Sequence, residues 1–230
     1  MSDAYRPPID PSILSLDEEE RVRLARLILG LRVRGLRDMT VLGAIEQVPR
    51  KLFVTAEDRH RALNDRPLAI ECGQTIPAPS TVGTLLQALG PAPGQRVLEV
   101  GTGSGYMAAV IARIAGTVFT LDRYRTLVEL AVERFAALRA GNVVAAVGDG
   151  FLGWPDHAPF DRILVSGSAP EVPAALLEQL RPEGALVMPV GAAGAPQRLL
   201  RLTRGDRGLV EEDLGEIRAV PLVPGRAQTL

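Results

Sequence analysis

The residues best suited to binding a ligand lie between Val97 and Tyr106, in the sequence Val-Leu-Glu-Val-Gly-Thr-Gly-Ser-Gly-Tyr. An apolar run that contains Glu99 leads into a loop with three alternate glycines and then into an apolar segment with helical spacing. A strand, a glycine turn and a helix start in this order bring backbone N–H groups close to a nucleotide-like ligand. The spacing is G-x-G-x-G, whereas a dinucleotide pyrophosphate is bound by G-x-G-x-x-G. The loop therefore favours a ligand without a pyrophosphate. S-adenosylmethionine fits, because it needs close backbone approach and a carboxylate for its ammonium or ribose.

Two further strand ends carry acidic residues suited to the same ligand. An apolar segment from Gly116 predicts a strand that ends in Asp122, where an acid can accept hydrogen bonds from both ribose hydroxyls. A segment from Asn142 predicts a third strand that ends in Asp149 and Gly150, whose carboxylate and amide can bracket an adenine edge. One glycine turn is weak evidence, but three consecutive strand ends with suitable polar groups indicate a cofactor site.

Composition narrows the classes of function. The chain has 230 residues, which suits one large domain or a domain with an N-terminal annex, and its net charge of −1 gives no electrostatic footprint for nucleic acid. Cys72 is the only cysteine, and His60 and His157 have no zinc-like partner pattern, so we expect no metal. No apolar run reaches transmembrane length and the first residues do not form a signal segment, so we expect a cytoplasmic protein.

Helices and a loop must lie before the glycine motif. Ser15 and Glu18 have the spacing of a capping box, which predicts a helix that ends near Gly35, and Thr40 is expected to cap a second one. Residues 67–79 are irregular and rich in glycine and proline, which is typical of a loop that forms a site wall. A third helix follows this loop.

From residue 96 the predicted elements alternate. Strands are expected near 96–101, 117–122, 143–148, 161–166 and 184–190, with helices near 105–115, 124–139 and 173–180. This alternation predicts an α/β, Rossmann-like, doubly wound and mainly parallel sheet. After Gly191 two strands follow one another, at 197–203 and 217–223, which predicts an antiparallel C-terminal edge. We expect a helical cap over residues 1–66 and a cofactor-binding domain over 67–230, packed as one unit.

The chain resembles the protein-L-isoaspartate O-methyltransferase family over roughly residues 20–229. The glycine motif is shared by many methyltransferases, whereas Gly73-Gln74-Thr75-Ile76 and Val220-Pro221-Leu222 are much more specific to this family. Val48-Pro49-Arg50 also matches. The resemblance implies a class I fold that binds S-adenosylmethionine and methylates the stray α-carboxylate of isoaspartyl residues in damaged proteins. The ester then collapses to a succinimide, which reopens partly to normal aspartate.

The same resemblance implies the site residues. Cofactor contacts would fall on Gln74, Thr75, Ile76, Glu99, Gly101, Thr102, Gly103, Ser104, Gly105, Asp122, Asp149, Gly150 and Gln228. The family serine that faces the transfer point is replaced by Pro77, which has neither a hydroxyl nor an N–H to donate. Thr75 and Ser80 are the other candidates for a catalytic role, and Ser80 could supply the missing hydroxyl. The implied partners are isoaspartyl peptides or proteins, with no nucleic acid and no membrane, and we expect a monomer.

The same residues are compatible with more than one function. A carboxylate acceptor has a pKa of about 4, so it is ionised at neutral pH and needs no general base. Pro77 therefore does not exclude isoaspartyl methylation. A related methyltransferase with a different carboxylate or peptide acceptor is the first alternative. A non-catalytic S-adenosylmethionine-binding sensor or partner module is the second. A nicotinamide dehydrogenase is disfavoured by the glycine spacing.

Overall fold

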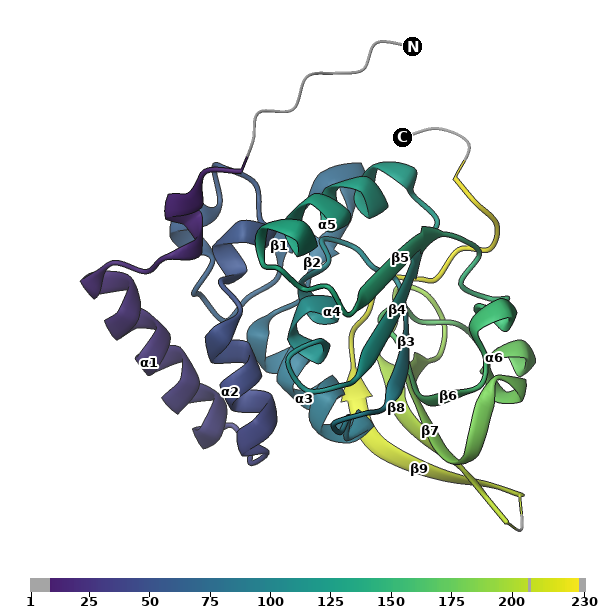
Figure 1. Ribbon diagram of the computed structural model, residues 1–230. Coiled ribbons are helices and arrows are strands. Elements are labelled where there is room, and N and C mark those ends of the chain that lie inside the picture. Colours follow the sequence, from purple (N-terminus) through teal and green to yellow (C-terminus); the bar gives the residue numbers. More distant parts are fainter. Residues whose placement is uncertain (1–8, 207, 228–230) are drawn as a thin grey trace, which may run out of the picture.

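A seven-stranded sheet forms the centre of the computed structural model, which describes residues 9–206 and 208–227 (Figure 1). The strand order is β5-β4-β3-β6-β7-β8-β9. The first five strands in this order run parallel, and β8 and β9 are antiparallel to their neighbours. The predicted mainly parallel sheet with an antiparallel C-terminal edge is therefore confirmed. The strands are β3 (Arg96–Val100), β4 (Thr117–Asp122), β5 (Val143–Val147), β6 (Phe160–Val165), β7 (Leu180–Val190), β8 (Gln197–Gly205) and β9 (Gly208–Ile217).

The order of the strands reverses between β3 and β6. Strands β4 and β5 extend the sheet on one side of β3, and β6 and β7 extend it on the other. Val100 near the end of β3 pairs with Leu121 of β4 and with Val165 of β6, so these three carboxyl ends lie together. In open α/β sheets, ligands bind outside the carboxyl ends of the strands at such a reversal.

Helices cover both faces of the sheet. Figure 1 shows α3 (Pro79–Leu89), α4 (Tyr106–Ile111) and α5 (Arg125–Ala137) on one face and α6 (Ala174–Glu178) on the other. Neighbouring residues of the parallel strands pack into different cores: Val97 faces α3 to α5, whereas Leu98 belongs to the core that includes Leu176 of α6. This is the two-residue alternation expected of strands buried on both faces.

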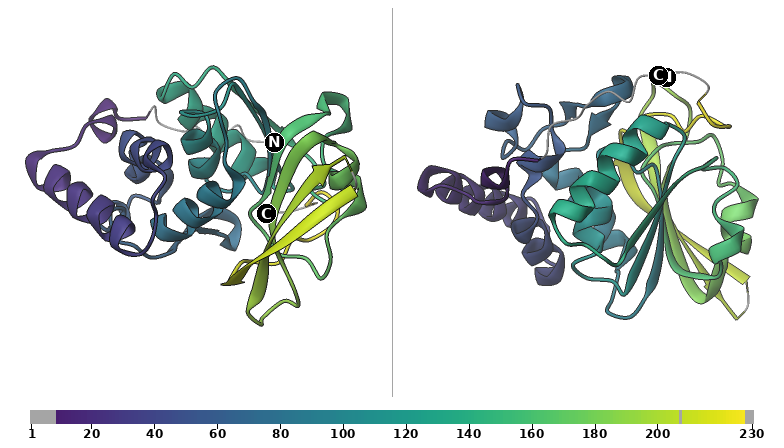
Figure 2. Two further views of the ribbon diagram at one scale, coloured as in Figure 1. Left: turned by 90° about the horizontal axis from the view of Figure 1, so that it is seen from below. Right: turned by 45° about the horizontal axis from the view of Figure 1, so that its top comes forward.

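The N-terminal helices form an additional layer. Both views in Figure 2 place α1 (Glu18–Val33) and α2 (Met39–Gln47) outside the layer of α3 and α4. Leu31 and Leu42 from these helices belong to the same hydrophobic core as Leu86, Ile111 and Val187. The cap and the sheet therefore share one core. Among the described residues, no helix is long and apolar enough to cross a bilayer.

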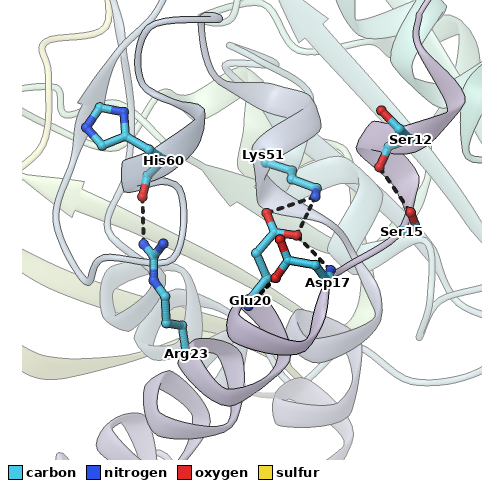
Figure 3. A network of polar contacts seen from close by, with 7 residues as sticks. All are labelled: Ser12, Ser15, Asp17, Glu20, Arg23, Lys51 and His60. Carbon is cyan, nitrogen blue, oxygen red and sulfur yellow. Dashed lines mark hydrogen bonds and ion pairs between the residues drawn. The ribbon is translucent and has the colours of Figure 1, made fainter.

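The start of α1 differs from the expected Ser15–Glu18 pair. The Asp17 carboxylate accepts the Glu20 N–H at 2.8 Å, and the Glu20 carboxylate accepts the Asp17 N–H at 3.1 Å (Figure 3). Because the helix begins at residue 18, the residue directly before it takes the capping position. Ser15 instead donates to the Ser12 carbonyl at 3.1 Å. In the same way Asp38, and not Thr40, caps α2.

A partly buried ion pair and a hydrogen bond connect α1 to the chain that follows α2. Lys51 Nζ lies 2.7 and 2.9 Å from the two Glu20 oxygens, and Arg23 donates to the His60 carbonyl at 2.6 Å (Figure 3). These contacts border a small cavity of about 190 Å³, whose wall includes Tyr106 of the central domain.

The last predicted strand is placed differently. We expected a strand at 217–223, but the last strand, β9, lies at Gly208–Ile217, where it forms a hairpin with β8 that pairs Gly205 with Gly208. Its residues are mostly exposed and many are acidic, so they lack the apolar pattern of a buried strand. Residues 218–223 run on across the carboxyl edge of the sheet, where Pro221 makes a bridge to Ser168. This segment covers the site described next.

Candidate active site

A cavity of about 400 Å³ lies at the carboxyl ends of β3, β4 and β6. Four stretches of chain supply most of its wall, namely residues 74–78, 99–104, 121–124 and 217–223. The structure thus brings together the glycine motif, the acid after the second strand, and the two stretches most specific to the resemblance. The cavity is the size of a site for a nucleoside-sized ligand together with part of a second molecule.

The glycine loop needs its glycines for conformation and for space. Gly101, Gly103 and Gly105 have φ values of 96°, 52° and 88°, which side chains rarely adopt. A Cβ on Gly105 would lie 2.9 Å from the Cβ of Ala131 in α5. The loop is also tied to β4, because the N–H groups of Gly101 and Thr102 both donate to the Leu121 carbonyl, at 2.8 and 3.0 Å. The backbone of the loop is therefore held in one conformation and forms part of the cavity wall.

Glu99 is a fully buried carboxylate in the cavity wall. One oxygen, Oε2, accepts the Thr120 hydroxyl at 2.5 Å, and Thr120 is in turn hydrogen-bonded to the Thr102 hydroxyl at 2.7 Å. The other oxygen, Oε1, has no hydrogen-bond partner among the described residues. Burial raises the pKa of Glu99 to about 8, against the opposing effect of the Thr120 hydrogen bond. An unpaired buried oxygen of this kind indicates a position for a cationic or hydrogen-bond-donating ligand group.

Asp122 lies at the end of β4 and is almost as deeply buried. Its two oxygens accept the N–H groups of Gly103 at 2.8 Å and Tyr124 at 3.0 Å. Burial raises the pKa of Asp122, while these N–H groups act in the opposite direction. The carboxylate is thus fixed in one orientation next to the glycine loop, with lone pairs left for a hydroxyl ligand.

Asp149 follows the end of β5 as predicted, but its carboxylate oxygens are hydrogen-bonded within the protein, and its contact with the adenine stays a prediction. Its oxygens accept the N–H groups of Phe151 at 2.9 Å and Gly225 at 2.7 Å, and it is not among the described residues that line the cavity. Its carboxylate fastens the C-terminal segment to the end of β5. Gly150 does line the cavity, and a Cβ there would lie 2.4 Å from Val100. Gln228 lies outside the described residues.

The loop that follows Gly73 forms the opposite wall. Thr75 and Ile76 make up β2 (Thr75–Ile76), which pairs with β1 (Leu68–Ala69), and Gln74 lies just before it. Gln74, Thr75, Ile76 and Pro77 all line the cavity. The predicted loop wall and the position of Pro77 are therefore both seen in the structure.

A buried arginine holds this loop from behind. The Arg50 guanidinium donates to the carbonyls of Ala62 at 2.7 Å, Arg66 at 3.0 Å and Pro77 at 3.0 Å. Burial lowers the pKa of Arg50, which is almost inaccessible to solvent. The Pro77 carbonyl thus points toward Arg50.

Ser80 is not among the described residues that line the cavity, whereas its neighbour Thr81 is. The Ser80 N–H donates to Asp65 at 2.8 Å at the start of α3. Sequence reasoning also missed Ser166, Arg123 and Arg218, which line the cavity but lie in no glycine or acid pattern. Position at a strand end was the one available signal for Ser166.

Comparisons with known proteins agree with this geometry. Residues 23–227 match the family described as protein-L-isoaspartate(D-aspartate) O-methyltransferase. The protein-L-isoaspartate O-methyltransferase of Xanthobacter autotrophicus is 50% identical over 213 residues, which cover 93% of this chain and 97% of the relative. The enzyme of the same name from Parvibaculum lavamentivorans is 48% identical over 216 residues, again covering 93% and 97%.

Solved structures give the same result. A structure named protein-L-isoaspartate O-methyltransferase superposes with a TM-score of 0.78 at 27% identity, covering 86% of this chain and 65% of that one. A Plasmodium falciparum β-aspartate methyltransferase in complex with S-adenosyl-L-homocysteine has a TM-score of 0.75 at 26% identity, covering 86% and 97%. The match spans the cap, the glycine loop and the covering C-terminal segment alike. The chain belongs to the protein-L-isoaspartate(D-aspartate) O-methyltransferase family.

Proposed function

We propose that the protein transfers a methyl group from S-adenosylmethionine to the α-carboxylate of L-isoaspartyl residues in damaged proteins. The observation that carries this proposal is the cavity at the strand reversal, whose walls include both the Glu99–Ser104 floor and the family-specific stretches at 74–76 and 220–222. The family match and relatives of nearly equal length that carry this name support it.

The residues present fit the cofactor. Glu99 Oε1 is a buried acceptor without a partner, which suits the ammonium group, and Asp122 is an oriented carboxylate beside the loop, which suits the ribose hydroxyls. The Gly101–Gly105 backbone allows close approach. When bound, S-adenosylmethionine supplies an electrophilic methyl group. No phosphate-binding group is required, in agreement with the short glycine spacing.

Methyl transfer to a carboxylate requires no general base or nucleophile from the side chains of the protein. A carboxylate acceptor is already ionised at neutral pH, so the protein need only orient it and exclude water. The wall residues suit this role, since Ile76, Pro77 and Leu222 are apolar and Arg123 and Arg218 bring positive charge to the same cavity. Because Pro77 has no hydroxyl, the acceptor loses one hydrogen bond that would orient it, but the reaction loses no general base.

A methyltransferase with a different carboxylate acceptor is the second candidate, and Pro77 in the cavity wall is the observation that favours it. We also propose that the protein acts as a monomer in the cytoplasm and not on nucleic acid. The net charge of −1 gives no electrostatic footprint for nucleic acid.

The test is methyl transfer from labelled S-adenosylmethionine to paired peptides that differ only in one isoaspartyl or aspartyl residue. We expect labelling of the isoaspartyl peptide alone. Labelling of another carboxylate peptide would favour the second candidate. Cofactor binding without transfer to any of a wider set of carboxylate acceptors would favour a sensor.

A further inference from the structure

Ser166 is a half-buried residue at the strand reversal, and the reaction described above does not use its hydroxyl. It directly follows β6, and its N–H donates to the Val100 carbonyl at 2.9 Å, which ties it to the end of β3. Its side chain faces the first glycine of the loop, since a Cβ on Gly101 would lie 3.4 Å from the Ser166 Cβ. The residue lines the 400 Å³ cavity.

The Ser166 hydroxyl has no hydrogen-bond partner among the described residues, although its oxygen is buried. Leaving such a group unpaired costs roughly as much as losing a hydrogen bond, so it points to a polar ligand group. The two hydroxyls of the glycine loop each have a partner within the protein: Thr102 is bonded to Thr120, and Ser104 accepts the Tyr106 N–H at 3.4 Å.

The position of Ser166 separates it from the acids assigned to the cofactor. Glu99 and Asp122 lie on β3 and β4, whereas Ser166 follows β6, on the opposite side of β3. The adjoining Gly167 packs against the covering segment, where a Cβ would lie 3.2 Å from the Val220 carbonyl oxygen. This side of the cavity is therefore the side on which the covering segment and its Arg218 lie.

We propose that the Ser166 hydroxyl donates a hydrogen bond to the acceptor carboxylate and so takes the role that Pro77 cannot fill. This inference rests on the proposed function, because it assumes a carboxylate acceptor in this cavity. A hydroxyl that donates to a carboxylate forms a charge-assisted hydrogen bond, which orients the acceptor oxygen. No proton transfer is needed, because the acceptor is already ionised.

The experiment compares Ser166→Ala with the wild type in three measurements. These are kcat/KM on an isoaspartyl peptide, the Kd of that peptide for the protein saturated with S-adenosylhomocysteine, and the Kd of S-adenosylhomocysteine itself. We expect kcat/KM to fall about 10-fold to 100-fold and peptide binding to weaken, with the affinity for S-adenosylhomocysteine changed less than about twofold. Ser166→Thr, which keeps a hydroxyl, should recover part of the loss.

Ser168→Ala is the matched control. It removes a hydroxyl two residues away that lies 3.5 Å from the Val220 carbonyl oxygen and is not among the described cavity-lining residues. Equal peptide binding and turnover in Ser166→Ala and Ser168→Ala would overturn the inference, as would a parallel loss of affinity for S-adenosylhomocysteine. A wild type that binds the peptide more tightly than Ser166→Ala but transfers no methyl group would overturn the proposed function and leave the inference standing. A wild type that does not bind the peptide would overturn both.

Discussion

At the scale of single residues, we expect Glu99 to couple cofactor binding to pH. Its pKa is raised to about 8 by burial, so in the free protein the side chain is protonated at neutral pH. A folded-state pKa above the unfolded value of 4.5 means that Glu99 stabilises the fold most below pH 4.5. This contribution is lost as the pH rises to 8. Ligand binding has the opposite sign, because an ammonium group pairs with the ionised form.

We therefore expect affinity for S-adenosylhomocysteine to rise by about tenfold between pH 6 and pH 7, since one proton is released on binding. Titration calorimetry at the two pH values measures this rise. Glu99→Gln should bind more weakly and show no such slope. A flat wild-type profile would mean that the ammonium group does not meet this carboxylate.

Pro77 sets the second expectation at this scale. Its carbonyl is held by Arg50 at 3.0 Å and its ring lines the cavity, so a serine there could add a hydroxyl to the wall without displacing the loop. Pro77→Ser should raise kcat/KM on an isoaspartyl peptide by up to about tenfold, the effect of one modest hydrogen bond. Ser80→Ala, outside the cavity wall, is the comparison. If both Pro77→Ser and the wild type bind cofactor but leave isoaspartyl peptides unmodified, the acceptor is a different one.

At the scale of elements, Arg50 links the helical cap to the cavity. It lies in a short 3-10 helix (Arg50–Phe53) and binds carbonyls of the chain between α2 and α3, including that of Pro77. Arg50→Met should lower the free energy of unfolding by roughly 3 kcal/mol, because several buried carbonyls lose a charged donor. It should also raise KM for the peptide.

Urea denaturation and steady-state kinetics test this expectation. Arg50→Lys keeps the charge but lacks the planar fork, so it should recover only part of the stability. Unchanged stability in Arg50→Met would show that the loop holds its shape by its own packing.

The elements also show what the sequence could and could not predict. Most strands of the parallel sheet were predictable because they are apolar runs closed by glycine or acid, and the glycine loop because its spacing demands a tight turn. The hydrogen bond from the Gly225 N–H to Asp149 was not predictable, because 76 residues separate the two. Nor was the contact between Arg50 and Pro77, because long-range hydrogen bonds leave no periodic signal. The strand expected at 217–223 was wrong and β9 at Gly208–Ile217 was missed, because β9 is exposed and rich in acidic residues whereas Ile217–Val223 is apolar.

At the scale of the whole molecule, the cap and the cofactor domain share their packing. The core that contains Leu31, Leu42 and Ile45 of the cap also contains Leu86, Ile111 and Val187, and Arg50 and the Lys51–Glu20 pair add polar links. When two parts of a protein share one hydrophobic core, neither can unfold alone without exposing apolar surface of the other, which is unfavourable. We therefore propose that residues 1–66 and 67–230 behave as one cooperative unit.

Native-state hydrogen exchange in low urea tests this unit directly. Slowly exchanging amides of α2 and of α4 should open with the same free energy and the same urea dependence, since each opening exposes the shared core. The hairpin of β8 and β9 is an internal comparison, because β9 is exposed along nearly its whole length and should open at lower cost. A bound S-adenosylhomocysteine should raise the opening free energy of α2 and α4 equally, since it binds only the folded state. If α2 opens several kcal/mol below α4 and does not respond to the ligand, the cap is a separate unit that merely rests on the cofactor domain.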